Sequence, residues 1–322
     1  MPSSDVFDGP VLVTMERSGR VESAHRGAVV VLDAYGQELA SAGTVDVPIF
    51  PRSANKPLQA TGMLRTGLAV TGEQLAMVTA SHSGEPQHIQ RILELLATSG
   101  FGEDDLRCPP SLPLGEAAQR ELLASGGGER RAAMNCSGKH AGMLCASAAV
   151  GWPAEAYLEP ASPVQRQIRE TLAKLTGHQL TEPAVDGCGA PLWPVPLRGL
   201  ATAFQRLVHA DVGTPERTVA DVMRDHPWLI GGTNRDVTRL MSGMHGLLVK
   251  DGAEGVLVAA MPAVGAVAVK IADGSQRART PLLVAGLRRL GLAGRTLDDL
   301  AESAVLGGGR PLGAIRSHWS ET

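Results

Sequence analysis

The chain has 322 residues, of which 43% are hydrophobic, 20% charged and 3% aromatic, and its formal net charge is −3. This balance provides a large apolar core but no excess of positive charge with which to bind nucleic acid or an anionic membrane. The scarcity of aromatic side chains also disfavours a stacking platform for single-stranded nucleic acid.

Runs rich in β-branched and small apolar residues lie near both ends of the chain and predict strands. The N-terminal runs form one meander. The C-terminal runs form a second, antiparallel meander with turns at Asp251-Gly252 and Met261-Pro262. The predicted strands cover residues 11–15, 27–33, 37–42, 247–250, 255–260 and 265–271.

Between the two meanders, apolar residues recur every three or four positions and predict helices. These helices cover residues 57–64, 73–78, 86–98, 115–124, 139–149, 163–175, 197–208, 214–223 and 235–244, and a last helix covers 281–290. Strands at both ends with helices between favour one α+β unit over residues 1–322, whose terminal strands join in a single antiparallel sheet. An alternative organisation has two intimate lobes, a sheet lobe from about 1–50 and 246–322 and a helical lobe from about 51–245.

Residues 1–10 lack the basic and apolar segments of a secretory signal, and the longest uncharged stretch, 255–269, is too short to span a bilayer. Four cysteines without an export signal predict reduced thiols rather than disulfides. We therefore expect a soluble cytoplasmic protein that binds neither nucleic acid nor membrane.

Lysine is scarce, because only five of the 30 basic residues are Lys. Unlike Arg, a desolvated Lys can lose its proton and act as a general base or a metal ligand. Lys56, Lys139 and Lys270 lie in short motifs, whereas Lys174, at a helix end, and Lys250, beside a turn, are interpreted as ordinary surface charges. A genomic drift from Lys to Arg would explain the scarcity of Lys but not its placement.

Ser53-x-x-Lys56 is the first motif that could carry nucleophilic chemistry. A serine hydroxyl needs a base to remove its proton, and a lysine three residues on reaches it across one turn. The alternative is an N-cap serine beside a solvated lysine. Arg52 could clamp a substrate carboxylate, although an ordinary surface Arg fits equally well. Gly231-Gly232-Thr233 superficially resembles a threonine-nucleophile motif and is interpreted as a turn.

A second polar segment, 80–85, contains Ser81, His82, Ser83 and Glu85 at the end of an apolar run, where functional sites often lie. Its alternative is helix capping by Ser83. A Ser-x-x-Lys, a Ser-x-Ser and a late strand that bears a lysine, here Lys270, form the arrangement of serine β-lactamases. The third motif lacks the usual Lys-Thr/Ser-Gly form, and Lys270 could also face solvent.

Cys136 and Cys188 lie in two further polar motifs, Cys-Ser-Gly-Lys-His and Asp-Gly-Cys-Gly. Two thiolates can hold zinc, and Lys139, His140, Asp186 and water are candidates for the remaining positions. The spacing matches no standard zinc finger, and buried unligated cysteines are the alternative.

Taken together, these motifs resemble those of the asparaginase II family, the serine- and lysine-dependent type, in family order from about residue 10 to 316. The resemblance implies a β-lactamase- or glutaminase-like fold, hydrolysis of L-asparagine to aspartate and ammonia, and a homodimer. It also implies two Ser-Lys pairs and a zinc site. The implied pairs are Ser53 with Lys56 and Ser81 with Lys270, and the implied zinc ligands are Cys136, Lys139 and Cys188.

We accordingly predict amide hydrolysis through an acyl-enzyme. Ser53 is expected to attack with Lys56 as its base and Ser81 with Lys270 to relay protons, although these roles could be exchanged. Zinc is expected to orient the substrate or shape the pocket rather than generate the nucleophile. The expected substrate-binding residues are Arg52, His82, Ser83, Glu85, His140 and Asp186. The alternatives are another small-amide hydrolase such as a glutaminase, a serine β-lactamase or peptidase-like enzyme, and a catalytically silent zinc- or ligand-binding module.

Overall fold

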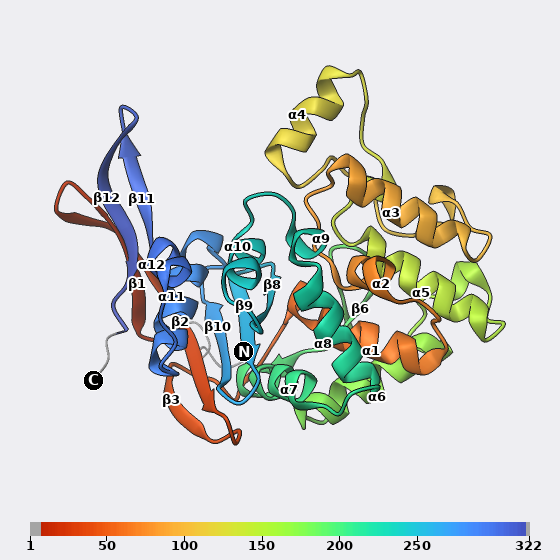
Figure 1. Cartoon of the computed structure of the whole chain (residues 1–322), viewed down its shortest axis with the longest axis horizontal. Coiled ribbons are helices and arrows are strands. Elements are labelled where there is room, and N and C mark those ends of the chain that lie inside the picture. Colours follow the sequence, from red (N-terminus) through yellow and green to blue (C-terminus); the bar gives the residue numbers. More distant parts are fainter. Residues whose placement is uncertain (1–7, 320–322) are drawn as a thin grey trace.

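The computed structural model describes residues 8–319, so most of the N-terminal stretch used to argue against an export signal lies outside the described residues. Strands from both ends of the chain form one antiparallel sheet in the order β11-β12-β1-β2-β10-β9-β8, with β3 paired to β2 (Figure 1). The strands are β1 (Val11–Arg17), β2 (Arg20–Asp33), β3 (Glu38–Ala42), β8 (Leu248–Gly252), β9 (Val256–Met261), β10 (Gly265–Ile271), β11 (Glu302–Gly307) and β12 (Arg310–Ser317).

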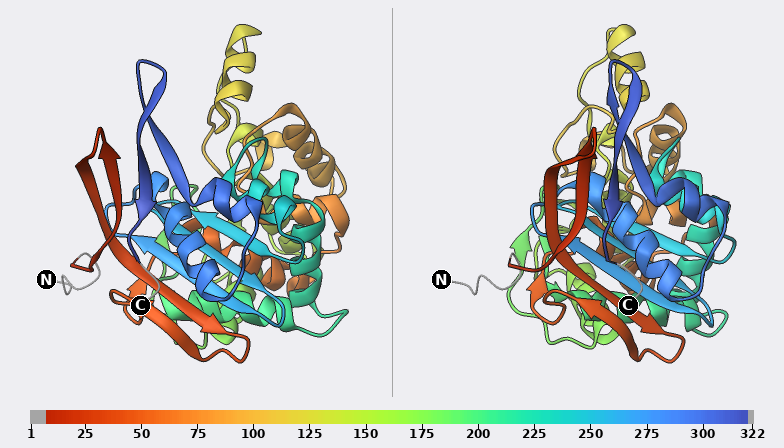
Figure 2. Two further views of the ribbon diagram at one scale, coloured as in Figure 1. Left: turned by 60° about the vertical axis from the view of Figure 1, so that its left-hand side comes forward. Right: turned by 90° about the vertical axis from the view of Figure 1, so that its left-hand side faces the viewer.

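The core of the sheet is β10, in which every residue is buried. Helices α7 (Leu197–His209) and α11 (Gln276–Arg289) both pack against β10 and β2. A strand covered on both faces has no polar face, which is why residues 265–271 form an almost continuous apolar run rather than an alternating one. The outer strands extend beyond these helices as twisted hairpins (Figure 2).

The remaining helices, except α12 (Arg295–Leu300), gather on the side of the sheet away from those hairpins, whereas α12 lies beside β11 and α11 (Figure 1). Helix α1 lies at their centre and packs against α2, α5, α6 and α8. Helix α4 stands away from the body above α3 (Figure 1). These helices are α1 (Lys56–Thr66), α2 (Gly72–Thr79), α3 (Pro86–Ala97), α4 (Glu116–Ala124), α5 (Ser137–Ala149), α6 (Pro163–Thr176), α8 (Pro215–Asp225), α9 (Pro227–Gly231) and α10 (Asp236–Gly243).

Short elements bring the polar motifs to the junction of sheet and helices. The 3₁₀ turn η2 (Arg52–Asn55) leads into α1 and contacts the edge strand β8. The short ladder of β5 (Ala184–Val185) and β6 (Pro191–Leu192) encloses the turn that carries Asp186 and Cys188. A second short ladder joins β4 (Pro48–Ile49) to β7 (Val195–Pro196).

The predicted α+β class, with an antiparallel sheet from both chain ends and a helical middle region, is confirmed. Strands β11 and β12 were not predicted, because most of their residues are exposed or half-buried and their turn contains three successive glycines. Helix α11 begins five residues before Pro281, so the prediction that this proline starts the helix is wrong. Within residues 8–319, no helix has the length and apolar character needed to cross a bilayer.

Candidate active site

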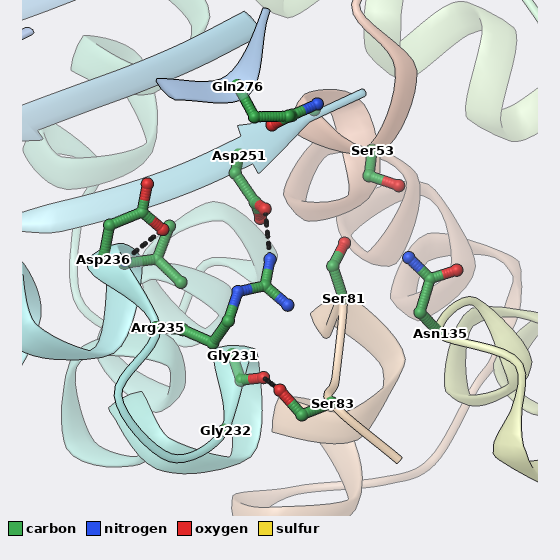
Figure 3. Close-up of polar contacts among 12 residues, drawn as sticks. Ser53, Ser81, Ser83, Asn135, Gly231, Gly232, Arg235, Asp236, Asp251 and Gln276 are labelled. Atoms are coloured by element: carbon green, nitrogen blue, oxygen red, sulfur yellow. Dashed lines mark hydrogen bonds and ion pairs between the residues drawn. The ribbon is translucent and has the colours of Figure 1, made fainter. Parts of the chain in front are cut away.

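A pocket of about 400 Å³ lies where the edge strand β8 meets the helical side of the molecule. It is lined from η2, the segment after α2, β8, the residue before α10 and the start of α11 (Figure 3). Its lining residues are Ser53, Ser81, Leu114, Asn135, Arg235, Asp251, Gly252, Ala253, Gln276 and Arg279. The two motif serines therefore share one pocket.

Ser81 is held between two lysines. Its Oγ accepts a hydrogen bond from Lys250 Nζ at 2.7 Å and another from Lys56 Nζ at 3.1 Å. The chain leaves α2 at Ala80 in an extended conformation, and the Ser81 amide donates to the carbonyl of Ile230. The Ser81 hydroxyl is thereby fixed at the pocket with two potential proton-transfer partners.

Lys250 has the properties of a general base for Ser81. It is completely buried, and its Nζ also donates to the Asp251 carbonyl and carboxylate. Burial, with the positive charge of Lys56 and against the attraction of Asp251, lowers the pKa of Lys250 to about 8. The prediction that Lys250 is an ordinary surface charge is wrong, because β8 continues through Gly252 and η2, α8 and α10 pack against this strand.

Lys56 opens α1 and is almost completely buried. Its Nζ donates to the carbonyls of Ala80 at 2.6 Å and Asn135 at 3.1 Å as well as to Ser81. Three acceptors match the three N–H groups of a charged ammonium. Lys56 does not donate to Ser53 as expected, and its hydrogen bond goes to Ser81 instead.

Lys270 does not contact Ser81, and the expected Ser81–Lys270 pair is replaced by Ser81–Lys250. The Lys270 ammonium donates to the carbonyls of Glu254 and Ile271, both at 2.6 Å. Its strand β10 lies two strands from β8, a separation of about 10 Å. The sequence carried a usable signal, because Lys250-Asp251-Gly252 has the Lys-x-Gly form that residues 269–274 lack.

Asp251 joins the lysines to two arginines. Its carboxylate accepts from Lys250 at 2.6 Å, from Arg235 at 2.8 Å and from Arg279 at 3.3 Å. Burial alone would raise the pKa of Asp251, but the surrounding Lys250, Arg279 and Arg235 hold it well below its usual range. Asp251 is therefore a permanent anion that organises three cations at the edge of the pocket.

A second cluster, formed by Cys136, Lys139 and Cys188, borders the Ser53 end of the pocket. Lys139 Nζ donates to Cys188 Sγ at 3.0 Å, and Ser53 Oγ lies 3.8 Å from Cys136 Sγ. A hydrogen bond from Cys136 and, against the effect of burial, the charge of Lys139 lower the pKa of Cys188 to about 5. Although burial opposes it, Cys188 and Cys136 raise the pKa of Lys139 above its usual value. The cluster thus pairs a thiolate with an ammonium.

These three side chains have the donor chemistry of a zinc site. Within residues 8–319, no group of three or more His, Cys, Asp or Glu could hold a metal ion. The further donor beside the two sulfurs is the Lys139 amine. Thiolates suit zinc, and Lys139 is buried and directed at a thiol rather than at solvent. Two sulfurs and one amine would therefore suit the ion as donors.

Three of the expected substrate-binding residues lie around this cluster instead. Arg52 Nε donates to Asp186 Oδ1 at 2.7 Å, and Asp186 Oδ2 lies 3.7 Å from Cys188 Sγ. His140 follows Lys139 on α5, and its Nδ1 lies 2.7 Å from the Tyr157 hydroxyl. Burial and the charge of Lys139 lower the pKa of His140 to about 3, so the ring is neutral.

The other expected substrate-binding residues, His82, Ser83 and Glu85, also make protein contacts. His82 Nε2 lies 2.9 Å from Ser137 Oγ. Burial, and to a lesser extent nearby positive charge, lowers the pKa of His82 well below its usual value. Ser83 Oγ donates to the Gly231 carbonyl, and Glu85 accepts from both the amide and the hydroxyl of Thr233. Gly231 ends helix α9 and Gly232 is its C-cap, so of the turn predicted at 231–233 only Thr233 lies in the turn, together with Asn234. Ser83 does not cap α3.

The sequence matches the family model described as L-asparaginase II over residues 13–317. No curated protein matches the sequence. A solved structure described as Mglu in its native form superposes with a TM-score of 0.42 at 15% identity, covering 77% of this chain and 60% of its own. This chain therefore spans about three fifths of that structure's length. A candidate β-lactamase from Bacteroides dorei DSM 17855 gives a TM-score of 0.40 at 12% identity, covering 83% of this chain and 86% of its own. Likenesses this distant say nothing about what this chain binds or does.

Proposed function

Because the chain belongs to the L-asparaginase II family, we propose that it hydrolyses the side-chain amide of L-asparagine to aspartate and ammonia at the pocket that contains Ser81. The observation that carries the proposal is the position of Ser81 Oγ between Lys250 and Lys56, with hydrogen bonds of 2.7 and 3.1 Å. A serine beside an amine of lowered pKa is the arrangement required for nucleophilic attack on an amide.

In the first half of the proposed reaction, the neutral Lys250 amine takes the Ser81 proton as Oγ attacks the amide carbon. The fixed charge of Lys56 stabilises the developing negative charge on Oγ and favours the neutral form of Lys250. The tetrahedral intermediate then collapses as the C–N bond breaks. The protonated Lys250 returns its proton to the nitrogen, ammonia leaves, and an aspartyl ester remains on Ser81.

In the second half, water attacks the ester carbon while Lys250 accepts one of its protons. The bond to Ser81 Oγ breaks, Lys250 protonates that oxygen, and aspartate is released. One amine thus serves as base and then acid in each half, so no further proton donor is needed.

This assignment exchanges the roles first expected for the two serines. Ser53 lines the same pocket, but its hydroxyl lies 3.8 Å from the weakly bonding Cys136 thiol rather than beside a lysine. We propose that Ser53 contacts the substrate or the catalytic water at the end of the pocket that borders the cluster of Cys136, Lys139 and Cys188. Attack by Ser53 remains the alternative that experiment must exclude.

We also propose that zinc is held by Cys136, Lys139 and Cys188, as the family resemblance implies and the donor set permits. When bound, the ion supplies positive charge beside the Ser53 end of the pocket and orients the amide. Neutralisation of its amine is the reason for a lysine rather than an arginine at position 139.

The test compares wild-type protein with Ser81→Ala and Ser53→Ala in an ammonia-release assay on L-asparagine, L-glutamine and simple amides, with a β-lactam as a separate substrate. The proposal expects ammonia from L-asparagine, a loss of about 10³-fold or more in Ser81→Ala, and a smaller loss in Ser53→Ala. Melting temperatures confirm folding of each variant. Wild-type turnover by Ser81→Ala, or a preference for the β-lactam, would overturn the proposal.

A further inference from the structure

Among the described residues, Arg235 is the cation lining the pocket whose donors are largely unused. It precedes α10 and lines the same pocket as Ser81. One terminal nitrogen donates to Asp251 Oδ2 at 2.8 Å, and the other guanidinium nitrogens have no hydrogen-bond partner among residues 8–319. In Figure 3 the guanidinium lies against Asp251 with a terminal nitrogen left on the Ser81 side of the pocket. Such an edge is ready to bind a planar anion.

The second pocket arginine, Arg279, shows the contrast. Its guanidinium donates to Asp236, Asp251, Gln276 and the Gly252 carbonyl, and its side chain is 6% exposed against 22% for Arg235. Arg279 is therefore a structural cation that holds the acidic residues in place. Arg235 is half-buried and can accept a partner from the pocket.

The segment that carries Arg235 is fixed to the segment that carries Ser81. The Ser81 amide donates to the Ile230 carbonyl, Ser83 Oγ to the Gly231 carbonyl at 2.8 Å, and Thr233 donates twice to Glu85. These hydrogen bonds between the motif at 81–85 and residues 230–233 therefore set the position of Arg235 relative to Ser81.

Backbone geometry makes the turn before Arg235 specific. Gly232 has a φ of +111°, and a Cβ at this position would lie 2.5 Å from Ser83 Oγ. Asn234 also has a left-handed φ of +61°. Asn tolerates that region better than most residues. A turn held this closely fixes the backbone of Arg235, which reduces the conformational entropy lost when the guanidinium binds a ligand.

Charge at this end of the pocket leaves room for one anion. When Lys250 is neutral, the cations at this end are Lys56, Arg235 and Arg279, and the anions are the carboxylates of Asp251 and Asp236, which pair with the two arginines. One positive charge is left over, and the guanidinium with open donors is Arg235. A substrate that brings one carboxylate completes the balance.

We infer that Arg235 binds the carboxylate of the substrate, so that the pocket accepts amides that carry a carboxylate and discriminates against amides that lack one. The inference rests on the proposed amide hydrolysis at Ser81. The competing role is purely structural, in which Arg235 acts on Lys250 through their shared partner Asp251.

The experiment crosses one residue with one substrate group. Wild-type protein and Arg235→Gln are assayed for ammonia release from L-asparagine and from 3-aminopropanamide, which is asparagine with its carboxylate replaced by hydrogen. We expect Arg235→Gln to lower kcat/KM for L-asparagine by about 10- to 100-fold and to leave 3-aminopropanamide within about twofold. Arg235→Lys keeps the charge without the planar fork and should fall between wild type and Arg235→Gln.

Arg65→Gln is the matched control, because Arg65 has the same 22% exposure and pairs with Glu216 outside the pocket lining. It should leave both reactions unchanged. An equal loss on both substrates in Arg235→Gln would overturn the inference and leave the proposed hydrolysis standing. No ammonia from either substrate in wild-type protein would overturn the proposed function and the inference together. If Arg235→Gln does not fold, the same comparison on Arg235→Lys decides.

Discussion

Lys250→Arg is the sharpest perturbation of the proposed mechanism, because it keeps the positive charge and removes the ability to lose a proton. Lys250 Nζ lies 2.7 Å from Ser81 Oγ, and its pKa is lowered to about 8. Arginine stays protonated in proteins and cannot accept the Ser81 proton. Since general-base catalysis contributes about 10²- to 10⁴-fold, Lys250→Arg should lower kcat by that factor.

The wild-type pH profile gives an independent measure of the same group. The active form of Lys250 is the neutral amine, so kcat/KM should rise with pH through about 8 and then level off. With that pKa, about one tenth of the molecules have a neutral Lys250 at pH 7 and about nine tenths at pH 9, which predicts a rise of about tenfold.

The assay is steady-state ammonia release from L-asparagine between pH 6 and pH 10, with folding checked by thermal melting. Lys174→Arg is the matched control, because Lys174 is exposed on α6 and should tolerate the same exchange. A Lys250→Arg variant with near wild-type kcat, or a wild-type profile that stays flat through pH 8, would refute Lys250 as the base.

Three further outcomes follow from the contacts described above. Lys270→Met should reduce the free energy of unfolding by about 1–3 kcal/mol, because two carbonyls lose a buried donor, while kcat changes little. A loss of kcat as large as that of Lys250→Arg would restore Lys270 as a catalytic group. Gly232→Ala should reduce the free energy of unfolding by about 1–3 kcal/mol, because of the positive φ of Gly232 and the close contact with Ser83, as measured by chemical denaturation. It should also raise KM for L-asparagine by displacing Arg235, and an unchanged KM would contradict the proposed support of Arg235. Protein purified without chelator should contain about one zinc per chain by elemental analysis, and Cys188→Ser should lose it; wild-type protein without zinc would remove the metal from the account.

Much of the architecture was predictable because burial leaves a clear sequence pattern. The apolar run at 265–271 is a strand covered on both faces, and the apolar spacing of 197–208 matches a helix that packs on the sheet. The outer hairpin at 302–317 left no such pattern, since its residues are mostly exposed.

The candidate site was predictable in its membership more than in its pairings. Short motifs identified Ser81, Lys56 and the Cys136–Cys188 pair, all of which lie at or beside the pocket. The partner of Ser81 depends on strand order, which places β8 and not β10 at the sheet edge, in contact with η2. The motifs do not encode that order, and the one local signal for Lys250, its Lys-x-Gly form, was outweighed by the apolar strand around Lys270.

Arg235 could not have been identified from sequence at all. It is one of 25 arginines, and no motif marks it. What distinguishes it is geometric. The turn before it is held by Ser83 and Glu85, and its guanidinium has donors that Asp251 does not occupy. Sequence reasoning assigned Ser83 and Glu85 to the substrate, whereas the structure places them on the turn that precedes Arg235.

The most direct test of the central claim is to identify the acylated residue. Wild-type protein turning over L-asparagine is quenched with acid, digested, and mapped by peptide mass for an added aspartyl group. The account predicts the adduct on Ser81 and its absence in Ser81→Ala. An adduct on Ser53, or rapid turnover with no adduct under any quench condition, would contradict it.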